Sequence, residues 1–167
     1  MKVVGKSEAT VGVGGLAKFE IVKPVDENFG IVIPKIGVNS KVIPDVDPEN
    51  GAIYQRALTQ GVAHALGTKY PGEEGNVFIF AHSGQDLFEA NRYNAVFYLL
   101  SKMEAGDEIY VFYKNKKYRY SVTAKKTAAP EEIQYFDDLP GKNTLTLMTC
   151  WPGGTTWKRL IVRAEQN

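Results

Sequence analysis

The feature of this chain that most constrains its fold is a series of short runs rich in β-branched and aromatic residues, separated by turn-forming residues. The runs occupy residues 30–34, 40–44, 77–81, 108–113, 117–123, 144–149 and 159–164. Glycine, proline, asparagine and aspartate punctuate them, as expected for strands joined by turns and loops. Many short strands with few helical interruptions are typical of all-β barrels and sandwiches. The sequence therefore predicts an all-β domain.

Two stretches depart from the strand pattern. In residues 50–65, Tyr54, Ala57 and Leu58 recur at helical spacing, which predicts a short helix or two and places His64 at a helix end or in a loop. Residues 94–103 are apolar almost throughout and predict a short helix docked on the core. Lys114, Asn115 and Lys116 separate two strands, so the basic cluster there is interpreted as a solvated hairpin.

Length and charge limit the classes of protein that fit. A chain of 167 residues is usually one domain. Residues 1–17 are small and glycine-rich and predict a flexible lead-in, so the domain is expected over 18–167. The net charge of +1 gives no sign of a nucleic-acid partner or an anionic membrane surface. No window reaches the ~20 apolar residues of a membrane span, which fits either a cytosolic protein or the soluble part of an anchored one.

The last two predicted strands bring two reactive side chains together. Period-two alternation puts Leu145 and Leu147 on the core face of the first strand and Cys150 on the opposite face. In the second strand, Arg159 likewise lies on the side opposite Leu160. If the chain reverses near Gly154, Cys150 and Arg159 are equally far from the turn and face one another. The same non-core face carries Thr144, Thr146 and Arg163.

This pairing has a chemical use. A free thiol has a pKa near ~8.5, and a nearby cation raises the fraction of thiolate, which is the nucleophile. A guanidinium at that position can also stabilise the oxyanion formed when a carbonyl is attacked. The missing acid–base group is expected to be a histidine. Of the two histidines, His82 is favoured because it ends a predicted strand, whereas His64 is assigned a structural or supporting role.

Each of these residues also has an ordinary interpretation. A single cysteine such as Cys150 excludes an intramolecular disulfide and is, taken alone, more often a small buried apolar residue than a nucleophile. A lone histidine is more often structural, and a lone arginine on a strand is usually a solvated charge. It is the combination that points to cysteine chemistry.

Several segments resemble the sortase family of cysteine transpeptidases. Residues 146–150, Thr-Leu-Met-Thr-Cys, resemble its TLxTC signature, and Arg159 before Leu-Ile-Val resembles its essential arginine. Residues 71–83 are similar to the segment leading into the sortase histidine, and 30–37 and 106–109 match further stretches. The resemblance runs from about Phe29 to the C-terminus, and the class within the family stays open, with no clear match to the housekeeping class A.

The resemblance implies a closed β-barrel and a reaction. Cys150 would cleave an LPxTG-type sorting signal after its threonine to give a thioacyl-enzyme, and His82 would protonate the departing amine. Arg159 would bind the substrate backbone and support the oxyanion. An amine, from a cell-wall precursor or a pilin lysine, would then take the acyl group of the surface protein. The resemblance also implies an enzyme at the extracellular face of the bacterial membrane, with residues 1–17 as the remnant of a linker to an anchor.

The resemblance assigns some residues by motif position alone. Thr149, Trp151, Ala81 and Ser83 are candidate substrate-binding residues, and Ala81 stands where many sortases have glycine. Some sortases bind calcium, but no set of acids here makes a site, so no metal and no cofactor are expected; the acids considered are Glu73, Glu74, Glu131 and Glu132.

Two alternative functions use the same residues or the same fold. A hydrolytic cysteine peptidase would pass the acyl group to water, and only its free-acid product would distinguish it. A non-catalytic β-barrel binding module is the third possibility, although such a module has no need of Cys150, His82 and Arg159 together. The sequence leaves open the exact sorting motif, the choice between wall anchoring and pilus assembly, the physiological amine and the oligomeric state.

Overall fold

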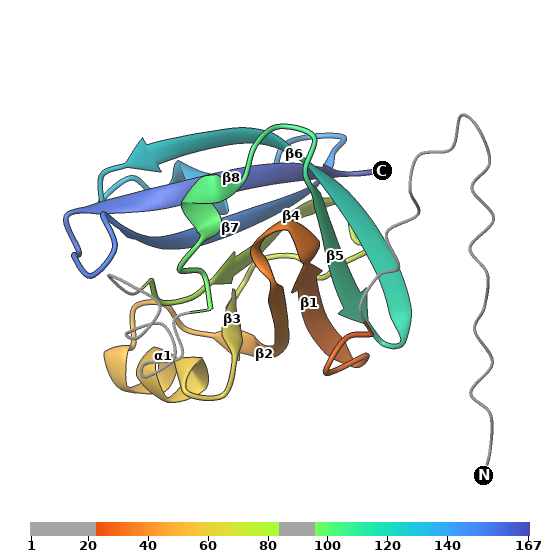
Figure 1. Ribbon diagram of the computed structural model, residues 1–167, viewed down its shortest axis with the longest axis horizontal. Helices are drawn as coiled ribbons and strands as arrows, with labels where there is room; N and C mark the ends of the chain where they lie inside the picture. The colour runs from red at the N-terminus through yellow and green to blue at the C-terminus, as the bar shows by residue number, and fades with distance from the viewer. Residues whose placement is uncertain (1–22, 84–95) are drawn as a thin grey trace, which may run out of the picture.

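The fold is a closed barrel in which β7 lies between β4 and the last strand, β8 (Figure 1). The computed structural model describes residues 23–83 and 96–167, so the predicted lead-in over 1–17 lies outside the described residues. The strands are β1 (Phe29–Ile33), β2 (Val38–Val46), β3 (Val62–Ala65), β4 (Gly75–Phe80), β5 (Glu108–Tyr113), β6 (Lys116–Ala128), β7 (Asn143–Trp151) and β8 (Lys158–Gln166). The helical elements are α1 (Gly51–Leu58), η1 (Pro34–Ile36), η2 (Leu100–Lys102) and η3 (Gln134–Phe136).

The order of strands around the barrel is β1-β2-β3-β4-β7-β8-β6-β5, and β5 pairs with β1 to close it. Most neighbours are antiparallel, whereas β2 with β3 and β4 with β7 are parallel. Each parallel pair needs a crossover, and α1 lies in the first of them. Because the barrel is closed, every strand is paired on both sides. The predicted all-β barrel is confirmed.

The barrel interior is filled by one face of each strand. Ile79, Leu147 and Val162 share register across β4, β7 and β8 through the pairs Ile79↔Leu147 and Leu147↔Val162, and all are buried. This confirms the predicted core face of β7 and β8. The opposite face is also covered over its first half, since Thr144 and Thr146 are fully buried. Sequence alternation therefore assigned the faces correctly but could not show that a loop covers the outer one.

The β5–β6 hairpin follows the prediction closely. Its turn residues Lys114 and Asn115 both have positive φ, 50° and 61°, the conformation of a two-residue hairpin turn. The turn lies at the opposite side of the barrel from α1 and the β7–β8 turn (Figure 1). The basic cluster is thus separated from the site described below.

The helical predictions are only partly correct. Residues 51–58 form α1, but residues 62–65 form the strand β3, so the assignment of His64 to a helix end or loop is wrong. Two alanines in a four-residue run carry little β-propensity, and pairing with β2 and β4 decides the outcome. In the described part of the 94–103 segment, η2 forms, and Phe97 and Leu100 are fully buried against the core.

Candidate active site

Cys150 and Arg159 form a cross-strand pair at the end of β7 and the start of β8. Directly opposed residues of an antiparallel pair project from the same face, so the thiol and the guanidinium lie on the outer face together. Both side chains are half-buried. The predicted symmetric reversal is present, because Trp151 pairs with Lys158 and Gly154 lies in the turn with a φ of 77°.

His82 reaches the same position from the other side of β7. The parallel pairing of β4 with β7 ends at Phe80↔Met148, and continuing the same register by two residues on each chain brings His82 level with Cys150. Hydrogen bonds hold the chains together there. The amide of Ala81 donates to the carbonyl of Met148 at 3.2 Å, and the hydroxyl of Ser83 donates to the carbonyl of Cys150 at 2.8 Å. The structure thus aligns His82, Cys150 and Arg159 across three neighbouring segments.

The His82 ring lies in a partly desolvated position. It is half-buried, and burial lowers its pKa below the ordinary value of 6.5 because it penalises the charged imidazolium. Its Nε2 lies 3.2 Å from Oε1 of Gln55 on α1. A histidine with a lowered pKa is neutral at neutral pH and can therefore accept a proton from a thiol.

The Arg159 guanidinium is held by the turn that precedes it. Its Nη1 donates to the carbonyl of Thr156 at 3.1 Å and to that of Lys158 at 3.3 Å. The turn is itself closed by Thr155, whose amide donates to the carbonyl of Pro152 at 3.0 Å. These contacts occupy one nitrogen of the guanidinium and leave its other donors for a ligand on the outer face.

An apolar row adjoins the three aligned residues on the same face. Phe80, Met148 and Ile161 are matched in register across β4, β7 and β8, one step back from His82, Cys150 and Arg159. Beyond this row, the loop containing η3 covers the sheet, and Phe136 stacks on Phe78 with ring centroids 4.0 Å apart. Phe80 and Ile161 are themselves 6% and 2% exposed, so Met148 is the partly exposed member of the apolar row beside the three reactive residues.

A buried polar network fixes the covering loop. The side-chain oxygen of Asn76 accepts from the hydroxyls of Thr144 and Thr146 at 3.0 and 2.8 Å, and its amide donates to the carbonyl of Tyr135 at 2.8 Å. Arg163 donates to the Thr146 hydroxyl at 3.3 Å and to the Tyr135 carbonyl at 3.2 Å. Sequence patterns did not reveal this network, since its partners lie about 60 residues or more apart in most pairs.

The candidate substrate-binding residues differ in their surroundings. Thr149 is 2% exposed and its hydroxyl donates to the buried carbonyl of Ala81 at 2.9 Å, so it joins β7 to the chain before His82. Ser83 is half-buried and makes the matching bond to Cys150. Trp151 is half-buried against the core, whereas Trp157, directly before β8, is 75% exposed. Substrate contact by these residues stays a prediction.

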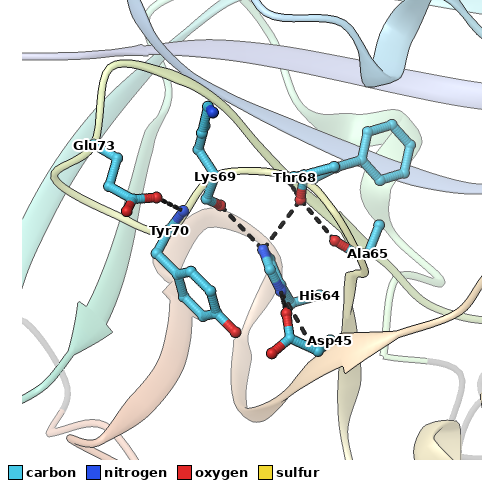
Figure 2. Close-up of polar contacts among 8 residues, drawn as sticks. Asp45, His64, Ala65, Thr68, Lys69, Tyr70 and Glu73 are labelled. Atoms are coloured by element: carbon cyan, nitrogen blue, oxygen red, sulfur yellow. Dashed lines mark hydrogen bonds and ion pairs between the residues drawn. The ribbon is translucent and has the colours of Figure 1, made fainter.

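His64 lies inside the barrel in a separate polar cluster (Figure 2). The amide of Asp45 donates to its Nδ1 at 3.3 Å, and Nε2 lies 3.0 Å from the carbonyl of Lys69. Because Nδ1 accepts, Nε2 carries the proton of a neutral ring. Burial lowers the pKa of His64, and Tyr70 packs on the ring with centroids 4.5 Å apart. His64 is thus fully buried, with its ring bonded to the surrounding backbone.

Neither a metal cluster nor a membrane-spanning helix is found among residues 23–83 and 96–167. Of the four acids named from the sequence, Glu73 accepts a hydrogen bond from the amide of Tyr70, and Glu132 accepts one from the amide of Ala129.

Comparison with known proteins identifies the relatives of this chain. A family model described as the sortase domain matches residues 31–167. Sortase A of Streptococcus agalactiae is 28% identical over 136 residues, covering 81% of this chain and 51% of that protein. Sortase D of Bacillus subtilis is 23% identical, covering 80% of this chain and 61% of that protein. The chain thus spans about half to three fifths of the length of these relatives.

Solved structures agree with the sequence relatives. Sortase C-1 from Actinomyces oris superposes with a TM-score of 0.71 at 29% identity, covering 86% of this chain and 76% of that one. Sortase A from Corynebacterium diphtheriae gives a TM-score of 0.71 at 28% identity, covering 84% of this chain and 60% of that one.

Proposed function

Because the chain belongs to the sortase family, we propose that it is a cysteine transpeptidase that joins a surface protein to an amine. The observation that carries the proposal is the alignment of His82, Cys150 and Arg159 on one face, through the β7–β8 pair and the continued register of β4 with β7. A nucleophile, an acid–base group and an anion-stabilising cation in one row are what acyl transfer requires. The catalytic domain is assigned to residues 18–167.

The first half-reaction makes a thioester. Neutral His82 accepts the thiol proton, and Sγ of Cys150 attacks the carbonyl carbon of the peptide substrate. Arg159 donates hydrogen bonds to the oxyanion of the tetrahedral intermediate, a contribution of roughly 3–4 kcal/mol for one well-placed donor. The carbon–nitrogen bond then breaks, and His82 returns its proton to the departing amine.

The second half-reaction releases the product. An incoming amine attacks the thioester carbonyl carbon, gives a proton to His82 and displaces Cys150 as the thiolate, which His82 reprotonates. The result is a new amide bond and a free enzyme. Water in place of the amine would give a carboxylic acid, which is the outcome for a hydrolytic peptidase.

The proposed substrate class comes from the family to which the chain belongs. We propose an LPxTG-type sorting signal, one of whose apolar residues contacts Met148, the partly exposed member of the apolar row, before the scissile threonine carbonyl reaches Cys150. Burial of an apolar side chain there contributes roughly 1.5–3 kcal/mol to binding. The partners are surface proteins bearing that signal and an amine from a cell-wall precursor or pilin lysine. The whole protein would act at the extracellular face of the bacterial membrane.

The test is an incubation with an LPxTG-type peptide library and an excess of a glycine-based amine, with products read by mass spectrometry. The matched control is Cys150→Ala. An amide-joined product that disappears in the control is expected. Free acid in place of amide would assign a hydrolase, and the absence of any Cys150-dependent product would leave a binding module as the better description.

A further inference from the structure

We propose that Gln55 on α1 is a positioning residue for His82, fixing the ring so that Nδ1 presents its lone pair to the Cys150 thiol. The inference rests on the proposed function for its catalytic consequence. It rests on geometry for the contact itself, since Oε1 of Gln55 lies 3.2 Å from Nε2 of His82. Neither the motif positions nor the family resemblance singles out this glutamine.

The position of Gln55 is determined by how α1 docks. Ala57 and Leu58 are buried at the C-terminal end of the helix. Next to Gln55, the ring of Tyr54 meets that of Phe80 edge to face with centroids 6.4 Å apart. Phe80 precedes His82 by two residues, so it projects from the same face of the sheet. The contact that anchors α1 on β4 therefore also brings Gln55 to the His82 ring.

The N-terminal end of α1 is also fixed. The side chain of Asn50 caps the helix by accepting a hydrogen bond from the amide of Ile53 at 3.2 Å. Gln55 lies between this cap and the buried end of the helix. An exposed glutamine on a helix held at both ends loses less conformational freedom when it bonds than one on a loop does.

The proposal includes the tautomer of His82, with Oε1 of Gln55 as the acceptor. A carboxamide oxygen only accepts, so the imidazole donates from Nε2 and a neutral ring has Nδ1 free of a proton. Nδ1 is then the base that takes the thiol proton. In the imidazolium that results, the Nε2 donor keeps its partner throughout the transfer. A neutral amide orients the ring without adding the negative charge by which a carboxylate would favour the imidazolium.

The experiment compares four forms of the protein with selectively 15N-labelled histidine. These are wild type, Gln55→Leu, Gln55→Glu and Gln60→Leu, the last a matched change at an exposed glutamine just beyond α1. Long-range 1H–15N spectra report the tautomer of His82, with buried His64 as the internal reference. The kcat and KM for the LPxTG-type peptide and the glycine-based amine are measured on the same samples.

In wild type and Gln60→Leu, His82 is expected to be the Nε2–H tautomer, with His64 also Nε2–H. Gln55→Leu should move His82 toward a mixture of tautomers and lower kcat by about tenfold with little change in KM, the scale of one lost hydrogen bond. Gln55→Glu keeps an acceptor and should keep the Nε2–H tautomer.

The outcomes separate the two proposals. If wild type shows no Cys150-dependent product, the proposed function fails, while the tautomer spectra still decide whether Gln55 orients the ring. If wild type is active and Gln55→Leu matches Gln60→Leu in tautomer and in kcat, the positioning role is overturned. A Gln55→Leu protein that does not fold is replaced in both comparisons by Gln55→Ala.

Discussion

The two histidines lie on neighbouring segments of one sheet, yet their surroundings give them opposite roles. His64 pairs in register with Ile79, three residues before His82, so an odd step separates the two and their side chains project to opposite faces. His64 points into the barrel and is 0% exposed, whereas His82 points outward and is half-buried. The face of the sheet from which each side chain projects therefore decides which histidine belongs to the core.

Burial alone does not distinguish the two. It lowers the pKa of both rings and favours the neutral form in each. The hydrogen bonds make the difference. Both nitrogens of His64 are engaged by the backbone, from Asp45 and at Lys69 (Figure 2), so the ring has no lone pair left for a substrate or a thiol. His82 bonds to Gln55 through Nε2, and none of residues 23–83 and 96–167 is hydrogen-bonded to its Nδ1.

The largest expected effect is on activity at His82. His82→Ala should lower the rate of peptide transfer by about 10³-fold, within the range for loss of a general acid–base. The free energy of unfolding should change by less than about 0.5 kcal/mol, as for a substitution outside the core. Transfer kinetics and urea denaturation measure both. If His82→Ala lowered the transfer rate by less than tenfold, His82 would not be the catalytic member of the two histidines.

The corresponding change at His64 should act on stability. His64→Ala removes a fully buried ring and leaves the amide of Asp45 and the carbonyl of Lys69 without their partner. We expect a loss of about 3 kcal/mol in the free energy of unfolding, by analogy with large-to-small core substitutions. The fraction that remains folded should keep its kcat. A destabilisation under about 1 kcal/mol would show that the cluster is not structural.

Substitutions of Arg159 test whether the site of His82, Cys150 and Arg159 needs a guanidinium or only a positive charge. Arg159→Lys keeps the charge but loses the fork that binds both the Thr156 carbonyl and a ligand. A fall of about 10²-fold in kcat/KM is expected, the scale of one lost oxyanion donor. Steady-state kinetics of Arg159→Lys beside Arg159→Ala give the answer. Equal activity of the lysine variant and wild type would reduce the role of Arg159 to charge alone.

The smallest effect is on the pH dependence of stability. A histidine with a lowered pKa in the folded state binds its proton more readily when unfolded, so stability falls as the pH drops below about 6.5 toward the folded pKa. For His64, the free energy of unfolding should fall by at most about 1.4 kcal/mol for each pH unit in this range. Urea denaturation at several pH values should show a flatter profile in His64→Gln than in wild type. His82→Gln should flatten it less, because solvent reaches that ring. A profile unchanged in His64→Gln would contradict the assignment.

Local alternation was enough to place Cys150 opposite Arg159. Both residues flank a short symmetric turn, so register and face follow from the period of a strand and the position of Gly154. The position of His82 at the end of a predicted strand favoured it over His64, and the family motif pointed to the same residue. These signals come from residues close together in the chain, so they can be recognised in the sequence alone.

The remaining features depend on pairing between distant segments. His82 joins Cys150 through a parallel pair with a register offset of 68 residues, as in Phe80↔Met148, and no local pattern encodes that offset. The strand that carries His64 was mistaken because its short alanine-containing run shows no β signal until its neighbours pair with it. The role proposed for Gln55 could not be predicted for a related reason, since it depends on where α1 docks rather than on the sequence around Gln55.

The measurement that tests the central claim most directly is intact-protein mass spectrometry after incubation with an LPxTG-type peptide and no added amine. The account predicts a mass increase equal to the acyl part of the peptide, located by proteolysis on the fragment containing Cys150 and reversed by a glycine-based amine. It should be absent from Cys150→Ala and greatly slowed in His82→Ala. Transfer product formed at the wild-type rate by Cys150→Ala would contradict the assignment of Cys150 as the nucleophile.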